Sequence, residues 1–287
     1  MSDARLRATL TGAVAILLWA TLALGATLSA GLPPFELLAL TFSIGGLAGL
    51  AVVARGGRLA RLRQPPAAFA LGVAGLFGYH FFYFVALAHA PPVDASLINY
   101  LWPLLIVLFS GLLPGERLQR HHLGGGLLGL AGAWVLISGG GTAPRLEYLP
   151  GYVSALACAF VWSGYTVLNR RFAGLPTDGV AGQCLAVAVL AALCHAAWEP
   201  TVRPSAVQWA VIGWLGLGPL GFAFYVWDHG SKHGDLQLLG VLSYATPVLS
   251  TLLLLAAGRG EPGWPVALAC ALIVGGALLA SGRFRRG

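Results

Sequence analysis

The sequence predicts an all-α integral membrane protein with ten transmembrane helices, arranged as two inverted five-helix repeats. Three observations lead to this fold class: the scarcity of charge, the length of the apolar stretches, and a second half that echoes the first. Charged residues make up 9% of the 287 residues and hydrophobic residues 57%, whereas about a quarter of a typical soluble protein is charged. The composition therefore excludes an ordinary soluble domain.

Ten apolar stretches are each about as long as a helix that crosses a bilayer, which needs about 20 mainly apolar residues. Their runs of Leu, Ala, Val and Gly do not alternate strictly with polar residues, so helices are expected and not the strands of a barrel. The gaps between them are too short for a separate soluble domain. The stretches are residues 8–29, 34–54, 67–89, 94–113, 121–139, 149–169, 178–198, 205–227, 236–257 and 264–282.

The second half of the chain repeats features of the first at a nearly constant offset. Trp19 matches Trp162, and the segment Tyr100–Pro103 matches Tyr244–Pro247. Because five is an odd number of crossings, the two halves enter the membrane from opposite sides. Such inverted repeats place a substrate site near the middle of the membrane, where the halves meet. The two expected repeat units are residues 1–144 and 145–287.

The basic residues are distributed unevenly between the two sides that ten crossings define. If the N-terminus is cytoplasmic, 14 of the 17 Lys and Arg residues lie on the cytoplasmic side and only Arg145, Arg203 and Arg259 lie outside. This split follows the positive-inside rule, so both termini are expected in the cytoplasm. The pI near 9.6 then reflects membrane topology, and no nucleic-acid partner is expected.

The candidate site lies where aromatic and hydrogen-bonding side chains gather inside the third and fourth stretches. All Asp, Glu, Lys and Arg residues fall at termini, loops or the ends of stretches, so a cavity without fixed charge is expected. A carrier of phosphates or nucleotide sugars would need basic residues there, which argues against that class. The candidate substrate-binding residues are Tyr79, His80, Tyr83, Asn99, Tyr100 and Trp102, together with Trp19, Trp162, Ser243 and Tyr244.

Two prolines occupy matched positions in the fourth and ninth stretches. Proline has no amide hydrogen, so Pro103 leaves the carbonyl of Asn99, and Pro247 that of Ser243, without its helical partner. Their equivalence favours a hinge or site role over two passive kinks. His80 is the histidine nearest the centre of a stretch. It is a substrate contact, a proton-linked switch, or a donor to a neighbouring carbonyl.

The remaining motifs do not indicate a cofactor, a metal or catalysis. The four cysteines lack the spacing of metal ligands. The segment Gly216–Gly221 satisfies GxGxxG but lies inside an apolar stretch, where close helix packing explains it better than a dinucleotide. No HExxH, GxGD or GxSxG arrangement occurs in the sequence. We therefore expect no enzyme activity, no cofactor, no metal site and no obligatory protein partner.

The five-plus-five pattern resembles the drug/metabolite transporter superfamily in its EamA-type branch. The run from Asp94 to Pro103 is similar to the aromatic amino acid exporters of that branch, and the segments Leu18–Thr21 and Gly240–Ser250 extend the resemblance. The resemblance implies export of Phe, Tyr and Trp across a bacterial inner membrane, with flat cations such as methyl viologen as further candidates. A broad-specificity drug or metabolite exporter is the alternative.

The charge distribution predicts which loops are accessible from outside. In a cysteine-free background, an impermeant thiol reagent added outside should label Gly141→Cys but not Gly57→Cys, because only the first residue lies in an outer loop. The reverse labelling pattern would overturn the orientation. The outer loops are expected near residues 30–33, 90–93, 140–148, 199–204 and 258–263.

Overall fold

The computed structural model describes residues 2–138, 145–258 and 263–280, and none of those residues forms a strand. Eight helical stretches are long and apolar enough to cross a membrane, and a shorter apolar helix covers Trp264–Ala280. The prediction of an all-helical membrane protein is therefore confirmed. The eight stretches are Asp3–Leu28, Pro34–Arg55, Pro66–His89, Pro92–Ser110, Leu146–Phe172, Thr177–Trp198, Ala206–His233 and Leu236–Ala256. The positions of Gly141, Arg259, Glu261 and residues 281–287 lie outside the described residues.

Four of these stretches consist of two helices joined by a break. The broken stretches contain α1 (Asp3–Ala20) and α2 (Leu22–Leu28), α5 (Pro92–Asn99) and α6 (Trp102–Ser110), α10 (Ala206–Leu217) and α11 (Ala223–His233), and α12 (Leu236–Leu242) and α13 (Ala245–Ala256). The turn between α10 and α11 is π-helical, η5 (Gly218–Phe222). The unbroken helices are α3 (Pro34–Arg55), α4 (Pro66–His89), α7 (Arg120–Ser138), α8 (Leu149–Leu168), α9 (Val180–Trp198) and α14 (Trp264–Ala280).

Short 3₁₀ turns connect some of the helices. They are η1 (Leu59–Leu62), η2 (Leu146–Tyr148), η3 (Asn169–Phe172) and η4 (Thr177–Gly179). The turns η3 and η4 both lie in the connection from α8 to α9, and both contact α11. That connection therefore packs into the bundle at its end.

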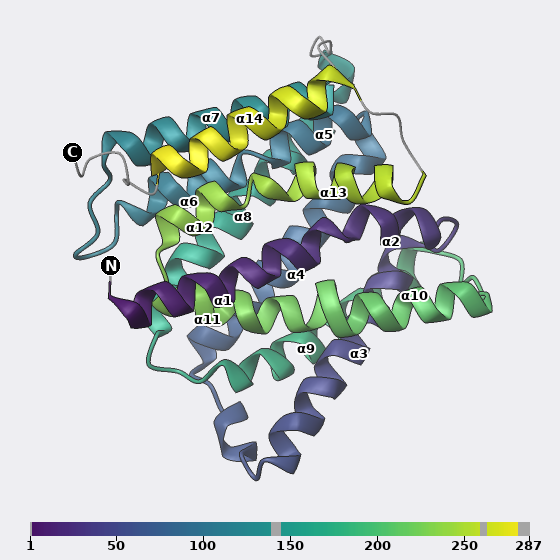
Figure 1. Cartoon of the computed structure of the whole chain (residues 1–287). Coiled ribbons are helices and arrows are strands. Elements are labelled where there is room, and N and C mark those ends of the chain that lie inside the picture. The colour runs from purple at the N-terminus through teal and green to yellow at the C-terminus, as the bar shows by residue number, and fades with distance from the viewer. Residues whose placement is uncertain (1, 139–144, 259–262, 281–287) are drawn as a thin grey trace.

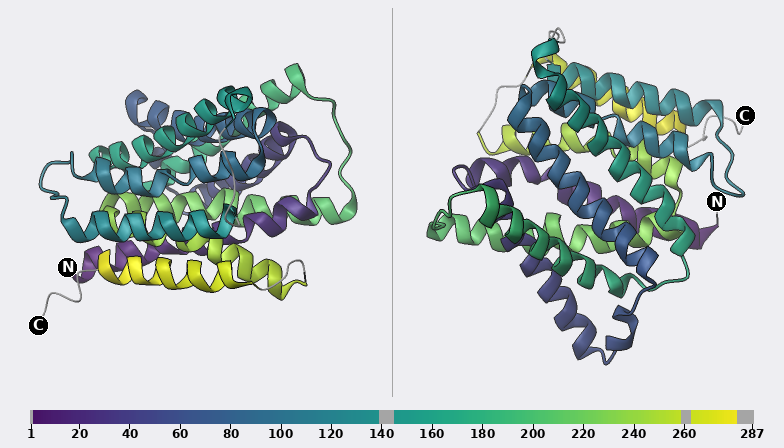
Figure 2. Two further views of the ribbon diagram at one scale, coloured as in Figure 1. Left: turned by 90° about the horizontal axis from the view of Figure 1, so that it is seen from above. Right: turned by 180° about the vertical axis from the view of Figure 1, so that it is seen from behind.

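The closest helix pairs each join an element of the first half of the chain to one of the second half. Helix α7 packs against α14, α3 against α9, α4 against α8, and α1 against α11. In Figure 1 the α7 and α14 pair runs along the upper edge, and the front face carries α1 and α11. The views of Figure 2 place α4 and α8 on the face behind them. The interior between these two faces is therefore bounded by both halves.

Glycine permits the shortest approaches between helices. A Cβ atom added to Gly125 in α7 would lie 2.5 Å from the carbonyl oxygen of Gly276 in α14. One added to Gly45 in α3 would lie 2.8 Å from both the Gly216 carbonyl oxygen and the Gly221 Cα. The GxGxxG segment therefore serves backbone packing around η5, as the sequence indicates.

The side of the bundle is apolar, whereas charged groups gather at its two ends. Leu47, Val189 and Phe160 are among the large hydrophobic side chains that remain exposed on the helices. Exposed apolar surface of this kind suits contact with lipid and not with water. The bundle thus has the surface of a protein that spans a membrane.

One end of the bundle, called here the basic end, is held together by arginines. The Glu116 carboxylate lies 2.9 Å from the Arg5 guanidinium and 3.1 Å from that of Arg170. Asp178 pairs with Arg58 at 3.2 Å. Arg5 lies at the start of α1, in the first half of the chain, and Arg170 follows α8, in the second half. Both bind Glu116, so these ion pairs join the two halves.

The opposite end is tied by two carboxylates. The Glu199 carboxylate accepts hydrogen bonds of 3.1 Å from the amides of Phe35 and Glu36, at the start of α3. A negative charge at that position is favoured by the helix dipole. The Glu36 carboxylate in turn accepts from the amide of Val202 at 3.0 Å. The start of α3 is thereby fixed to the connection between α9 and α10.

Adjacent glycines in α14 provide a direct test of the α7 contact. A Cβ at Gly276 would lie 2.6 Å from the Gly125 carbonyl oxygen, whereas one at Gly275 would meet nothing within 4 Å. Overpacking costs about 1–3 kcal/mol, while Ala in place of Gly contributes about 1 kcal/mol of helix propensity. We expect Gly276→Ala to lower the thermal unfolding midpoint in detergent and Gly275→Ala to leave it unchanged or raise it. Equal midpoints for the two variants would contradict the close contact.

Candidate functional site

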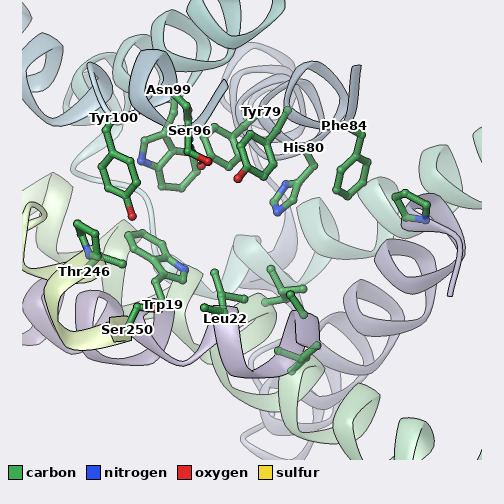
Figure 3. Close-up of a pocket in the computed structure, with 18 of the residues that line it drawn as sticks. Trp19, Leu22, Tyr79, His80, Phe84, Ser96, Asn99, Tyr100, Thr246 and Ser250 are labelled. Atoms are coloured by element: carbon green, nitrogen blue, oxygen red, sulfur yellow. Dashed lines mark hydrogen bonds between the residues drawn. The ribbon is translucent and has the colours of Figure 1, made fainter. Parts of the chain in front are cut away.

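A cavity of about 480 Å³ lies inside the bundle (Figure 3). This volume is within the range of sites that bind small molecules. Its wall is formed by α1 to α6, α8, α11 and α13, with contributions from the ends of α7, α10 and η5. The described residues that line it include no Asp, Glu, Lys or Arg. The wall therefore presents aromatic, aliphatic and neutral polar groups to a ligand.

Four tryptophans close the cavity on the side of the basic end. The Trp19 ring lies 5.5 Å from the Trp162 ring, 6.5 Å from the Trp102 ring and 5.0 Å from the Trp227 ring, measured between centroids. The first two contacts are edge-to-face, a favoured geometry for aromatic pairs. The Trp19 indole nitrogen also donates to the Pro219 carbonyl at 3.1 Å. These four rings are called the tryptophan layer below.

The lining continues in the other direction, toward the opposite end of the bundle. Ala26 and Ser29 at the end of α2, Pro34 at the start of α3 and Leu254 near the end of α13 all line the cavity. The ends of α2, α3 and α13 that carry these residues lie at the end of the bundle where Glu36 and Glu199 are found. The lining of the cavity therefore extends toward the opposite end, and the tryptophan layer bounds it toward the basic end.

Helices α4 and α5 supply a hydrogen-bonded aromatic wall. The rings of Tyr79 and Tyr83, one helical turn apart, stack at 6.1 Å with an angle of 9° between their planes. The Asn99 side-chain amide donates to the Tyr79 hydroxyl at 3.1 Å, and its oxygen accepts from the Cys158 thiol at 3.2 Å. Because the Tyr79 oxygen already accepts this bond, its hydrogen is oriented away from Asn99. Figure 3 shows Tyr79 and Asn99 on the same side of the cavity.

His80 lies on the cavity wall with its ring bonded to its own helix. Its Nδ1 is 2.7 Å from the Leu76 carbonyl oxygen, which can only accept, so the proton is assigned to Nδ1. The ring also meets Phe42 edge-to-face at 5.3 Å. The alternative in which His80 donates to a neighbouring carbonyl is therefore confirmed, and the same ring is among those that line the cavity.

The breaks before the two matched prolines are wider than single kinks. Two residues interrupt the helix between α5 and α6 and two between α12 and α13, although Leu101, Ser243 and Tyr244 keep right-handed helical dihedral angles. The expectation that the Ser243 carbonyl lacks a partner is not met, because it accepts from the Thr246 amide at 3.1 Å. Pro103 is the second residue of α6, and Pro247 is the third residue of α13. Pro247 lines the cavity, whereas Pro103 is buried behind it, with its carbonyl oxygen directed at Gly240 in α12.

The structure brings most of the predicted binding residues together. Trp19, Tyr79, His80, Tyr83, Asn99, Tyr100, Trp102 and Trp162 all line the cavity.

Two predicted residues lie outside the lining. The Ser243 hydroxyl donates to the Leu239 carbonyl at 2.8 Å, and the Tyr244 ring packs over Gly129 in α7. The expectation that they face the cavity is not met, because the second break is turned toward α7 and α14. Equivalent positions in the two halves therefore have different surroundings.

The wall also contains hydroxyl groups that sequence reasoning did not single out. Thr246 and Ser250 on α13 and Ser96 on α5 line the cavity, and Figure 3 places Thr246 and Ser250 beside Tyr100 and Trp19. The Thr246 hydroxyl is buried and has no hydrogen-bond partner among the described residues. It is free to bond to a ligand. The spacing of Thr246 and Ser250, four residues apart on one helix face, is the signal that could have found them.

Asp228 and Lys232 are buried in the last two turns of α11, near the end of the stretch, where charged residues were expected. Asp228 is 1% exposed and Lys232 is 4% exposed, and their charged groups are 2.9 Å apart. The eighth stretch was expected to end at residue 227, whereas α11 continues to His233. The spacing of four residues between opposite charges is a helical ion-pair signal that could have indicated this.

Comparisons with known proteins point to one family. Residues 6–138 and 149–282 each match the EamA-like transporter family. The aromatic amino acid exporter YddG of Ancylobacter novellus is 58% identical over 287 residues, which cover 98% of this chain and 99% of that protein. YddG of Escherichia coli K12 is 31% identical over 306 residues and 99% of both chains. A solved crystal structure that is 56% identical superposes with a TM-score of 0.95, over 98% of this chain and 99% of that one.

The two breaks lead to a prediction about helix shape. Pro103→Ala together with Pro247→Ala adds an amide hydrogen to each break. The Asn99 carbonyl, and the Ser243 carbonyl that now accepts from Thr246, can then bond to the residue four positions on, so the helices straighten. Spin labels at Val93→Cys and Leu112→Cys, two exposed positions at the start of α5 and just beyond the end of α6, should report a longer and narrower distance distribution. Pro66→Ala is the control, since a proline at the first position of a helix removes no helical hydrogen bond. An unchanged distribution in the double variant would contradict a role for the prolines in the breaks.

Proposed function

This chain belongs to the EamA-like transporter family, and we propose that it exports aromatic amino acids across the bacterial inner membrane in which it resides as a multi-pass protein. The observation that carries the proposal is the uncharged cavity lined by tyrosine and tryptophan rings. The YddG exporters that the chain resembles over nearly its whole length support it. Related flat compounds such as methyl viologen are further candidate cargo.

The aromatic wall provides affinity for the ring of the substrate. A well-placed aromatic pair contributes about 0.5–1.5 kcal/mol beyond the burial of its surface. The stacked Tyr79 and Tyr83 rings and the tryptophan layer give the cavity several such faces. An aliphatic amino acid gains the burial but not the stacking, so the cavity favours Phe, Tyr and Trp.

The polar groups of the wall suit the two charges of an amino acid. The ammonium group can lie over the faces of Trp102 or Tyr100, an arrangement that attracts cations. The carboxylate can accept from the Tyr79 hydroxyl, whose oxygen is already bonded to Asn99, and from the unpartnered Thr246 hydroxyl. Neutral contacts of this kind hold a zwitterion weakly, which an exporter needs in order to release it.

The finer architecture belongs to the same proposal: ten transmembrane helices, arranged as inverted repeats over residues 1–144 and 145–287. The two family matches, at residues 6–138 and 149–282, support this division. The helix pairs support it as well. If each helix is replaced by its equivalent in the other half, the α1–α11 pair becomes the α8–α4 pair, while the α3–α9 and α7–α14 pairs are unchanged. A pseudo-twofold axis in the membrane plane is expected of such repeats.

The side of the membrane that the cavity faces is inferred from the distribution of basic residues. The basic end carries most of the arginines, so the positive-inside rule places it, with both termini, in the cytoplasm. The lining of the cavity extends toward the other side, so we assign this structure to the outward-open state of an alternating-access cycle. Entry of cargo from the cytoplasm then requires the tryptophan layer to separate.

The proposal is tested by transport of labelled Phe into proteoliposomes of the purified protein, with and without an imposed pH gradient. Unlabelled Phe, Tyr and Trp should compete, while Leu and Val should compete several-fold more weakly. Competition by structurally unrelated drugs as strong as that by Trp would favour the broad-specificity alternative. Absence of Phe uptake would refute the proposal.

Removal of cavity rings should reduce transport of aromatic substrates selectively. Replacement of Tyr79, Tyr83, Tyr100 or Trp102 by Leu removes a stacking partner contributing about 1 kcal/mol, so Phe and Trp transport should fall several-fold. Residual transport of aliphatic amino acids should fall less. Trp134→Leu is the matched control, because Trp134 is 50% exposed on the outer face of α7.

Asn99 should behave differently from the rings. Asn99→Ala leaves the Tyr79 hydroxyl without its partner, at a cost of about 1–3 kcal/mol for a buried polar group. The Cys158 thiol keeps the Tyr79 carbonyl as its acceptor at 3.3 Å. The variant should impair all amino acid substrates alike. If all five variants are monodisperse in detergent and transport Phe at the parental rate, the substrate site lies outside this cavity.

A further inference from the structure

We infer that the buried Asp228–Lys232 pair is a second substrate subsite, which binds the ammonium and carboxylate groups of an amino acid when the transporter opens to the cytoplasm. The inference rests on the proposed function and on the proposed inverted repeat. It assigns chemistry to two charged residues of α11 that do not line the outward-open cavity.

Asp228 is surrounded by donors. Its Oδ2 atom accepts from Lys232 Nζ at 2.9 Å and from the Thr177 hydroxyl at 2.7 Å, and its Oδ1 atom accepts from the Asn169 amide at 2.9 Å. Lys232 donates further to the Leu175 carbonyl at 3.4 Å. The site is thus a built receptor for an ammonium group, at present filled by the ammonium group of the protein's own lysine.

The burial of this pair in the last two turns of α11 requires an explanation. Buried charges are costly, and an ionisable residue inside a transmembrane segment is by default a candidate for the transport path. A buried ion pair is moreover weak evidence for stability, because desolvation of both groups offsets their attraction. Apolar residues would hold α11 in place at least as well, so stability alone does not account for Asp228 and Lys232.

The internal repeat places Asp228 at a position that lines a cavity in the other half. Helix α4 ends at His89 and α11 ends at His233, at the same offset as the two proline motifs. At this offset Phe84 corresponds to Asp228. Phe84 lines the cavity that is now open to the outside. When the two halves exchange roles, Asp228 is expected to line the cavity that opens to the cytoplasm.

The contacts along α11 lead from the present cavity to Asp228. Phe224 lines the cavity, and one turn further on Trp227 belongs to the tryptophan layer. Asp228 and Ser231 continue the same face of the helix toward the basic end. Trp227 is held by a hydrogen bond of 3.2 Å from its indole nitrogen to the Thr166 hydroxyl. Separation of Trp227 from Trp19 therefore uncovers a path that passes Asp228.

Substrate binding at this site exchanges one ion pair for two. The α-ammonium group of the substrate takes the place of Lys232 Nζ on the Asp228 carboxylate, and the freed lysine meets the substrate carboxylate. At each stage every buried charge has an opposite partner, so no unpaired charge is left in the membrane. A substrate that lacks the ammonium group cannot displace the lysine. The pair thus selects zwitterions on the cytoplasmic side, before the ring reaches the aromatic cavity.

The experiment measures the KM for Phe separately on the two faces of the transporter, in proteoliposomes with defined orientation. Asp228→Asn keeps the shape of the side chain but removes its charge. We expect the cytoplasmic-face KM for Phe to rise at least tenfold and the outer-face KM to stay within twofold of the parent. Inhibition by phenylpropanoate, which has the ring and carboxylate of Phe without the ammonium group, should not weaken on either face, because Asp228→Asn leaves Lys232 available to a carboxylate.

A second variant separates binding from folding. Asp228→Asn combined with Lys232→Gln leaves no unpaired charge, so it should fold even if the single variant does not. It should show the same loss of cytoplasmic-face affinity for Phe. Gln183→Leu is the control, since it removes a buried hydrogen bond of 2.9 Å to Gln64 without removing a charge. Its KM should remain within twofold on both faces.

The outcomes distinguish this inference from the proposed function. A double variant that is monodisperse and keeps the parental cytoplasmic-face KM overturns the subsite. A loss of affinity that is equal on both faces, or equal for Phe and phenylpropanoate, also overturns it and assigns the pair a structural role. If the parent protein itself does not transport Phe, the proposed function fails first.

Discussion

The packing of Trp19 against Trp162, Trp102 and Trp227 is the contact on which the rest of the site depends. These rings come from four different helical stretches of both halves, so their contact is what closes the bundle at one end. The cavity lies on one side of this layer. On the other side, ion pairs and hydrogen bonds hold the helices together at the basic end. Rings in edge-to-face contact hold such a closure without covalent or ionic bonds, so it can separate and form again during transport.

Lipid imposes the second constraint, because it satisfies no backbone or side-chain polar group. The breaks in the helices therefore occur where protein surrounds them, and the exposed carbonyls and hydroxyls face the cavity or a neighbouring helix. Glycine contacts such as Gly45 with Gly216 and Gly221 let the π-helical turn fit against α3. A bundle that tolerates irregular backbone at this depth is one whose helices can bend.

Much of this arrangement could be predicted from the sequence, for a physical reason. Membrane helices are recognised by their length and hydropathy, and the prolines and aromatic rings of α4 to α6 identified the cavity wall. The failures have one cause: which face a residue presents is set by packing. Ser243 and Tyr244 match Asn99 and Tyr100 in sequence, yet α7 covers them. The eighth stretch was expected to end before Asp228, whereas α11 continues to His233, and the Asp228 carboxylate accepts from Asn169 and Thr177, which are far away in the sequence.

A neutral cavity, with a charged pair on the other side of the tryptophan layer, fits a zwitterionic cargo. An anion that crossed the tryptophan layer would leave its charge unpaired in a wall without ionised groups, whereas ring faces can attract a flat cation. A zwitterion carries both charges close together, so it can be held by hydroxyls and ring faces above the layer, and by opposite charges at Asp228 and Lys232 below it. In the proposed orientation, the weak neutral contacts face the outside and the charged pair faces the cytoplasm, so cargo is bound more tightly where it is collected than where it is released.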